Sequence, residues 1–229
     1  MSIKGTTPEL KDLSEAKRRL LALRLKGAAT PAASVDEIRP RPVGARTPIS
    51  IDQYRIWLHA SVQLELPIYN EPVTIGYRGA FDLGLLETSF NRFLERHEAW
   101  RTSFFVEQDE VLQVIHSELK VKLEMIDLSE LPRAEREIEA KRLATQQALH
   151  PIDLKTAPLF RTLVIRMAPD EHRFHLVLHH IIFDGMSLTQ TFIPELAAIY
   201  SALESGAEPL LPNRALQYAD YAAWRQKQV

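Results

Sequence analysis

The sequence contains no cysteine among its 229 residues and only eight glycines. Without cysteine, the chain has no disulfide framework, no cysteine-ligated zinc site and no cysteine nucleophile. The glycines do not form the patterns Gly-x-x-x-x-Gly-Lys or Gly-x-Gly-x-x-Gly, so the sequence does not predict a loop that cradles nucleotide phosphates. Gly-x-Ser-x-Gly is also absent, which argues against a serine hydrolase.

Long hydrophobic runs and a strong excess of one charge are missing as well. No stretch approaches the length that spans a bilayer, and the N-terminus lacks the apolar core of a signal peptide. The formal net charge of -2 supplies no basic field for nucleic acid. With 45% hydrophobic and 25% charged residues, the composition is that of a globular protein. We therefore expect a cytoplasmic protein that binds neither nucleic acid nor membranes.

Residues 1–48 differ from the rest of the chain. Basic side chains and leucines alternate over residues 13–25, between a candidate N-cap at Ser14 and a stop at Gly27, which predicts a short basic amphipathic helix. Residues 28–48 are rich in proline and alanine and predict an extended linker. Two interpretations of the helix stay open, namely a simple lead-in segment and a helix that docks an upstream carrier protein or polypeptide.

Residues 49–229 alternate between helical and strand patterns, which predicts an α/β sandwich in which helices cover a sheet. A capping box at Ser50 and Gln53 begins a helix that runs to about residue 64. A second capping box, at Ser187 and Gln190, begins another helix at residue 188. The expected helices after the first are 85–100, 133–150 and 188–204, and the expected strands are 73–78, 102–106, 111–116, 121–126, 160–167 and 172–180.

The most informative segment is His-His-Ile-Ile-Phe-Asp-Gly at residues 179–185, directly after an apolar strand pattern. Side chains alternate faces along a strand, so His179 and His180 point in opposite directions and do not share one metal ion. One imidazole is then free to face a cleft for acid–base or positioning chemistry, while Asp184 fixes the loop and Gly185 permits a reversal of the chain. Core packing of a histidine pair is the plainer alternative.

The pattern His-His-x-x-x-Asp-Gly resembles the core motif of the condensation domains of nonribosomal peptide synthetases. Three further segments resemble motifs of that family in the same order. Residues 47–57 resemble its first motif, residues 96–104 its second, with Trp100 where leucine is usual, and residues 218–224 its fourth. The resemblance implies a fold like that of chloramphenicol acetyltransferase, built from two similar lobes. Because the later motifs of the family do not follow, we expect residues 49–229 to be the N-terminal lobe alone, without the C-terminal lobe.

The resemblance also implies an activity. Condensation domains join an acyl or peptidyl group, held as a phosphopantetheine thioester on a donor carrier protein, to the amine of an aminoacyl group on an acceptor carrier. The family's catalytic histidine corresponds to His180, which either deprotonates or positions the amine. No cofactor binds the domain directly, because the phosphopantetheine arms belong to the partner carriers.

The other motif residues have supporting roles in this interpretation. His179, Asp184 and Gly185 complete the core motif, and Gly185 lets the backbone approach the thioester. We expect Asp184 to be anchored by an arginine. Arg96 and Arg101 are the candidates within this lobe, and the C-terminal lobe is the other source. Ser50 and Trp224 mark the first and fourth motifs as structural support.

Alternatives remain at this stage. The two histidines argue against a heterocyclising domain, and the second motif argues against an epimerisation domain. Stand-alone acyltransferases that use coenzyme A share the core motif, and a half-domain also suits a non-catalytic docking fragment. Trp100 and residues 181–185 resemble condensation domains that follow polyketide modules. We further expect the lobe without its partner to expose an apolar face and to form homodimers.

Overall fold

The computed structural model describes residues 37–42 and 44–228. The chain divides into two units, Met1–Ile38 and Arg39–Val229, and the second unit contains all of the described helices and strands. The predicted basic helix at residues 13–25 lies outside the described residues. The predicted linker extends to residue 48, but its residues from Arg39 onward belong to the second unit. The elements are β1 (Thr47–Pro48), α2 (Ile51–Val62), β2 (Asn70–Arg78), α3 (Leu83–Arg96), η2 (Glu98–Arg101), β3 (Thr102–Glu107), β4 (Glu110–Ile115), β5 (Met125–Asp127), α4 (Arg133–Leu149), β6 (Phe160–Ala168), β7 (Glu171–His179), α5 (Gly185–Ser187), η3 (Leu188–Phe192), α6 (Ile193–Glu204) and α7 (Tyr218–Gln226).

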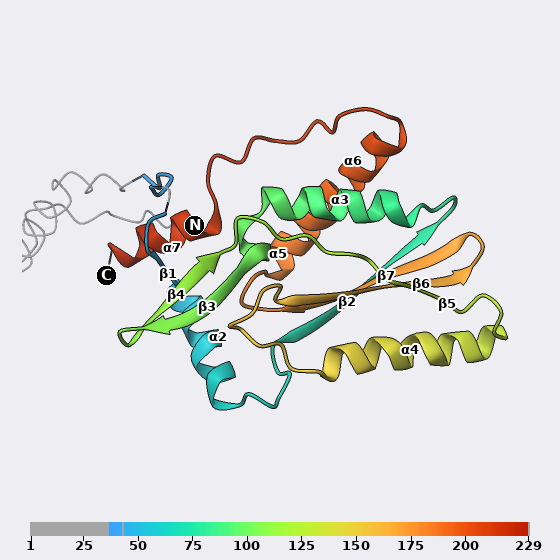
Figure 1. Ribbon diagram of the computed structural model, residues 1–229, viewed down its shortest axis with the longest axis horizontal. Helices are drawn as coiled ribbons and strands as arrows, with labels where there is room; N and C mark the ends of the chain where they lie inside the picture. The colour runs from blue at the N-terminus through green and yellow to red at the C-terminus, as the bar shows by residue number, and fades with distance from the viewer. Residues whose placement is uncertain (1–36, 43, 229) are drawn as a thin grey trace, which may run out of the picture. The chain divides into compact units, whose positions relative to one another are not determined.

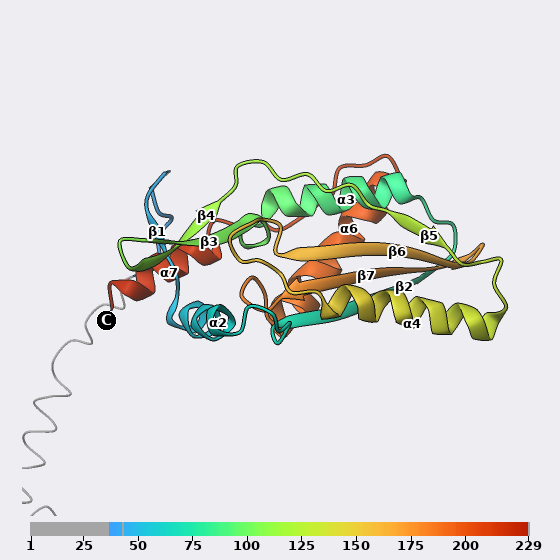
Figure 2. The same ribbon diagram turned by 60° about the horizontal axis from the view of Figure 1, so that its bottom comes forward.

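A four-stranded sheet with the order β2-β7-β6-β5 forms the centre of the second unit. β7 pairs antiparallel with both β2 and β6, and the short β5 pairs parallel with β6. Helices α3 and α6 lie on one face of this sheet and α4 lies on the other (Figures 1 and 2). The mixed α/β class predicted from the sequence is therefore present.

Alternation along β6 explains why both faces of the sheet are covered. Phe160 and Val164 belong to a large core with the side chains of α3 and α6, whereas Leu163 and Ile165 pack toward α4 in a second, smaller core. Because successive strand residues point to opposite faces, a strand with apolar side chains on both faces needs a helix layer on each side. The large core centres on Phe90, which is fully buried and makes edge-to-face contacts with neighbouring aromatic rings.

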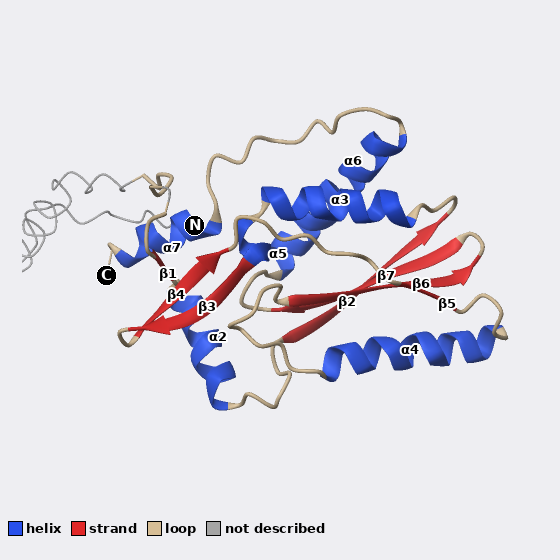
Figure 3. Cartoon of the chain, in the orientation of Figure 1, coloured by secondary structure: helices blue, strands red, loops and turns tan. Residues whose placement is uncertain are grey.

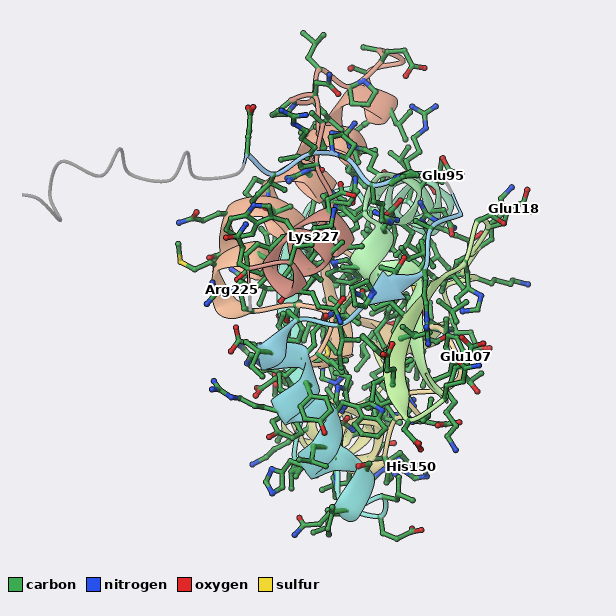
Figure 4. The ribbon with its side chains drawn as sticks, turned by 90° about the vertical axis from the view of Figure 1, so that its left-hand side faces the viewer. Glu95, Glu107, Glu118, His150, Arg225 and Lys227 are labelled. Atoms are coloured by element: carbon green, nitrogen blue, oxygen red, sulfur yellow. The ribbon has the colours of Figure 1, made fainter. Side chains whose placement is uncertain are left out.

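A second sheet, with the order β1-β4-β3, stands next to α2 and α7 (Figure 3). Its hairpin turn holds Gln108 and Asp109 at positive φ, which places β3 and β4 in register. Exposed charged side chains of both signs, among them Glu107 and Lys227, point outward around this end (Figure 4). Within the described part of the chain, no helix is both long and apolar enough to cross a membrane.

The helix expected at 85–100 ends at Arg96, and residues 98–101 form the separate turn η2. Two further element boundaries differ from the sequence prediction for clear physical reasons. The strand expected at 121–126 forms only as Met125–Asp127. Side chains of α3 bind the backbone before it, since Val121 N donates to Asn91 Oδ1 at 2.8 Å and Leu123 N donates to Glu87 Oε2 at 2.8 Å. These bonds replace those of a sheet neighbour.

The helix expected at 188–204 begins earlier, at Gly185, and continues through a π-helical turn into α6. Its N-cap is Asp184 and not Ser187, because Asp184 Oδ1 accepts a hydrogen bond from Ser187 N at 2.7 Å. The predicted capping box at Ser187 and Gln190 is therefore wrong by one turn of helix.

Candidate active site

The two histidines at the end of β7 lie in different environments. His179 is the last residue of the strand and only 4% exposed, and its Nδ1 accepts a hydrogen bond from Ile181 N at 3.3 Å. Burial, reinforced by the nearby His180, lowers the pKa of His179 to about 4, so its imidazole is neutral near pH 7. His180 is partly exposed, and its backbone N–H donates to Tyr69 O at 2.9 Å. Its ring contacts that of Phe183 at a centroid distance of 5.4 Å.

His180 lines a cavity of about 450 Å³, and His179 is not among the lining residues. The walls of the cavity come from α2, from the η2 turn, from the loop after β7 and from the segment that leads into α7. Each of the four motif segments contributes to it, namely Gln53 from the first, Trp100 from the second, His180 from the third and Tyr218 from the fourth. The fold thus gathers motifs that are far apart in the sequence around one imidazole.

The first motif joins the other segments through hydrogen bonds. The predicted capping box is present, with Ser50 Oγ accepting from Gln53 N and Gln53 Oε1 accepting from Ser50 N, both at 3.1 Å. Gln53 is 4% exposed, and its Nε2 donates to Ile181 O at 3.3 Å. Ser50 Oγ also pairs with Tyr218 OH at 2.8 Å. Ser50 therefore links α2 to α7, while Gln53 holds the loop that carries His180.

Asp184 caps a helix, and the two arginines predicted as its partners within this lobe, Arg96 and Arg101, do not bind it. Its carboxylate caps α5, and in return Asp184 N donates to Ser187 Oγ at 2.8 Å. The backbone N–H of Ser187 is the main reason that the pKa of Asp184 lies below its ordinary value. Among the described residues, no arginine forms an ion pair with Asp184, which is exposed. A helix N-terminus stabilises a carboxylate without a cation.

Arg96 and Arg101 are engaged elsewhere. Arg96 donates to Glu195 Oε2 at 3.4 Å and to Pro212 O at 2.8 Å. Arg101 donates to the carbonyl oxygens of Leu94 and His116 and so joins the end of α3 to the end of β4. Both arginines therefore support the second motif and not the loop that holds Asp184.

Gly185 does not occupy a turn conformation that requires glycine. It is the first residue of α5, and its φ lies outside the positive region that L-residues avoid. A Cβ added here would meet no atom within 4 Å. The expectation that Gly185 enables a chain reversal is therefore wrong. The open space beside it is compatible with the close approach of a substrate.

A buried carboxylate that the sequence patterns did not single out lies behind the cavity. Glu195 on α6 is 6% exposed and accepts hydrogen bonds from His97 Nε2 at 2.7 Å, from Arg214 Nε at 3.0 Å and from Arg96. Burial disfavours its charged form, but the bonds from His97 and Arg214 outweigh burial, so the pKa of Glu195 lies below its ordinary value. Burial also lowers the pKa of His97, although Glu195 opposes this shift.

A second polar link closes the end of the site that faces α7. Asp220, at 4% exposure, accepts from Arg41 Nη1 at 2.8 Å, and Arg41 also pairs with Glu98 at 2.6 Å. The bridge ties the segment before β1 to the second and fourth motifs. Trp224 lies further along α7, with its ring 6.1 Å from that of Tyr221, and is not among the residues that line the cavity.

Metal binding has no support in the described part of the chain, where no group of three or more histidine, cysteine, aspartate or glutamate side chains could hold an ion. The polar groups that line the cavity include the imidazole of His180, the guanidinium of Arg214, the hydroxyl of Tyr218 and the carboxylate of Asp184. Such groups suit hydrogen bonding and proton transfer.

Comparison with known proteins identifies the family. A sequence model described as "Condensation domain" matches residues 45–229. One of the linear gramicidin synthase proteins of Brevibacillus parabrevis is 42% identical over 183 residues, which cover 80% of this chain and 4% of that protein. Phosphinothricin tripeptide synthetase PhsC of Streptomyces viridochromogenes is 30% identical over 217 residues, which cover 95% of this chain and 20% of that protein.

Solved structures of related domains resemble the fold of this chain. The X-domain from teicoplanin biosynthesis superposes with a TM-score of 0.73 at 30% identity, over 84% of this chain and 40% of that chain. The starter condensation domain of rhizomide synthetase RzmA also reaches a TM-score of 0.73, at 21% identity, over 80% of this chain and 44% of that chain. At 21% identity, the second likeness shows the fold alone. The coverage of both structures agrees with the predicted single lobe of the chloramphenicol acetyltransferase-like class. The chain belongs to the condensation-domain family of nonribosomal peptide synthetases. It spans less than half of the length of either solved structure.

Proposed function

We propose that residues 49–229 form the N-terminal lobe of a condensation domain that makes an amide bond between two carrier-bound substrates. The observation that carries the proposal is the cavity at His180, because all four family motifs contribute residues to its wall. The names of the characterised relatives, which include peptide synthetases, favour the same conclusion. The partners would be a donor carrier protein, an acceptor carrier protein and a C-terminal lobe.

The reaction would proceed by attack of the acceptor amine on the donor thioester carbonyl. A C–N bond forms, the C–S bond breaks, and the proton lost by the amine ends on the released thiol of the donor's phosphopantetheine arm. A free α-amino group has a reference pKa of about 7.7–8.0, so part of it is already neutral at physiological pH. His180 then needs only to accept a hydrogen bond that aims the amine and to take part of its proton.

The rest of the motif would act through His180. Neutral His179 and the Gln53 bond to Ile181 hold the loop in place. Asp184 fixes the start of α5, and the open space beside Gly185 leaves room for the thioester. In this proposal the phosphopantetheine arms come from the carriers, and the lobe itself holds no cofactor.

A second candidate function is docking of a partner protein without catalysis. One solved relative, the X-domain from teicoplanin biosynthesis at 29% identity, was determined as a complex with OxyB. If the His180 cavity is intact but the lobe's role does not depend on His180, docking is favoured.

The test compares His180→Ala with His150→Ala. His150 is exposed at the end of α4 and lies outside the cavity, so it is a matched control. The chain is assayed together with a C-terminal lobe encoded downstream of Val229, and mass spectrometry follows product on the acceptor carrier. Loss of a general acid or base typically lowers a rate by roughly 100- to 10,000-fold. We expect a loss in this range for His180→Ala and none for His150→Ala.

Two results would contradict the proposal. If His180→Ala keeps normal product formation, His180 is not the catalytic group. If the gene encodes no second lobe and the chain forms no product, the docking function is favoured.

Light scattering of the chain with and without the second lobe checks the expected self-association.

A further inference from the structure

A second cavity lies at the opposite end of β7 from His180. It measures about 170 Å³ and is walled mainly by hydrocarbon and aromatic side chains from β2, α3, β7 and α6, among them Ile75, Phe81, Leu86, Phe174 and Leu196. β7 is 9 residues long, so at about 3.3 Å per residue roughly 26 Å separates its first and last residues. An apolar cavity of about 150 Å³ is large enough to hold benzene. The second cavity is therefore the size of a benzene ring with a small substituent.

His172 places an unused hydrogen-bond donor at this cavity. The residue lines the cavity and is 1% exposed, with its ring stacked on Phe81 at a centroid distance of 4.3 Å. Its Nε2 accepts a hydrogen bond from Arg166 Nε at 3.3 Å. Burial, with a further contribution from Arg166, lowers the pKa of His172, so the ring is neutral. A neutral imidazole that accepts at Nε2 carries its proton on Nδ1, and that buried Nδ1 has no partner among the described residues.

Tyr200 supplies a second donor. Its hydroxyl oxygen accepts a hydrogen bond from Asp82 N at 3.1 Å, and no described residue accepts the hydroxyl hydrogen. The neighbouring Tyr77 differs, because its hydroxyl donates to Ala80 O at 2.8 Å. Buried polar groups without partners are rare in native proteins, since each costs free energy. His172 and Tyr200 both line the cavity, and neither donor has an acceptor among the described residues, which points to a ligand that carries an acceptor.

The surroundings decide which acceptor fits. Arg166, which binds His172, is already paired with Asp127 at 3.1 Å. A carboxylate ligand would therefore be buried among apolar side chains without a free cation, which is unfavourable. A carbonyl oxygen can accept both hydrogens without bringing a charge.

We propose that this cavity binds a small uncharged aromatic molecule with a carbonyl group, whose oxygen accepts hydrogen bonds from His172 Nδ1–H and Tyr200 O–H. The ring fills the apolar space between β2 and α6. The proposal does not depend on the condensation activity, because the cavity is separate from the one at His180.

The test uses two probes of the same shape, acetophenone and ethylbenzene, of which only the first carries an oxygen. The 229-residue chain, with its histidines labelled with ¹⁵N, is titrated with each probe, and the His172 Nδ1 resonance and the dissociation constant are recorded. We expect acetophenone to bind at least about tenfold more tightly, the ratio that corresponds to one hydrogen bond of about 1.4 kcal/mol. The His172 resonance should shift with acetophenone.

Variants separate the hydrogen bonds from simple cavity filling. His172→Phe keeps a ring on Phe81 but removes one of the two donors, so the preference for acetophenone over ethylbenzene should fall. Tyr200→Phe should reduce the preference in part, and His150→Phe, remote and exposed, should change nothing. His172→Leu, which also lacks a donor, serves if the Phe variant does not fold. Failure of acetophenone to bind the wild type, equal binding of the two probes to the wild type, or an undiminished preference in a folded His172 variant would overturn the proposal.

Discussion

The two ends of β7 each place a histidine at a cavity, but the surroundings of the two imidazoles differ. At the C-terminal end, His180 is partly exposed, and the cavity of about 450 Å³ also presents polar groups such as Asp184, Arg214 and Tyr218. At the N-terminal end, His172 is buried, and the cavity of about 170 Å³ is mainly apolar. A histidine within β7 thus lies at a mainly apolar cavity, whereas the histidine that directly follows β7 lies at a cavity with several polar groups. The difference comes from the residues that the neighbouring elements bring to each end.

The two ends also depend on different forces. Behind the His180 cavity, a buried carboxylate binds two arginines and a histidine. Around His172, aromatic rings stack and one hydrogen-bond donor stays unused among the described residues. We therefore expect the polar end to respond strongly to loss of one charge and to pH, and the apolar end to tolerate loss of its polar atom.

The largest effect is expected for Glu195→Ala. Removing this carboxylate leaves Arg96 and Arg214 beside a buried space without their anion, and breaking a buried ion pair costs about 3–5 kcal/mol. Guanidinium denaturation of the chain measures the change in the free energy of unfolding. Glu208→Ala is the control, because Glu208 is exposed and its pair with Arg92 should be worth at most about 1 kcal/mol. Equal losses in the two variants would mean that the Glu195 cluster is not a buried network.

The next effect is a loss of stability in acid. The pKa of His179 is about 4 in the folded chain, below its ordinary value of 6.5. Between these pH values the unfolded chain binds a proton at this residue and the folded chain does not. Stability from this residue is therefore complete above pH 6.5 and is lost as the pH falls toward 4, by roughly 3 kcal/mol. His179→Gln should flatten the unfolding free energy between these pH values, whereas His150→Gln should not. Parallel pH profiles for wild type and His179→Gln would contradict the assignment.

A smaller effect is expected for Asp184→Ala. Because Asp184 caps α5 and does not hold an arginine, the loss should be that of an N-cap, about 1 kcal/mol, and Asp184→Ser should recover most of it. Urea denaturation of the three proteins is the measurement. A loss of about 3–5 kcal/mol would indicate a buried arginine partner in solution.

The smallest effect is expected for His172→Phe. The variant loses the hydrogen bond from Arg166, worth about 1 kcal/mol, but it also removes a buried donor whose missing partner costs about 1–3 kcal/mol. The free energy of unfolding should therefore stay within about 1 kcal/mol of the wild type or rise. A loss of more than about 2 kcal/mol would show that Nδ1 has a partner in the native protein, such as a buried water.

Local patterns account for what the sequence determined by itself. The strand before His179, the capping box of Ser50 and Gln53, and the succession of helices and strands follow from alternation, helical periodicity and capping preferences, which act within a few residues. The four spaced motifs were sufficient to place the chain in its family. Strand parity also predicted that His179 and His180 diverge, since adjacent side chains on a strand point to opposite faces.

Tertiary structure decided which polar groups meet. Glu195 lies within α6, where nothing in its local sequence distinguishes it from a surface glutamate, and only the packing of α6 against α3 brings it to His97 and Arg96. Asp184 was expected to bind an arginine, but its carboxylate accepts a hydrogen bond from the backbone N–H of Ser187 in α5. The backbone at residues 121–123 forms hydrogen bonds with side chains of α3 and not with a neighbouring strand. Partners that are distant in the sequence depend on how whole elements pack, and no local propensity encodes that arrangement. The residues that line each cavity at the ends of β7 were decided in the same way.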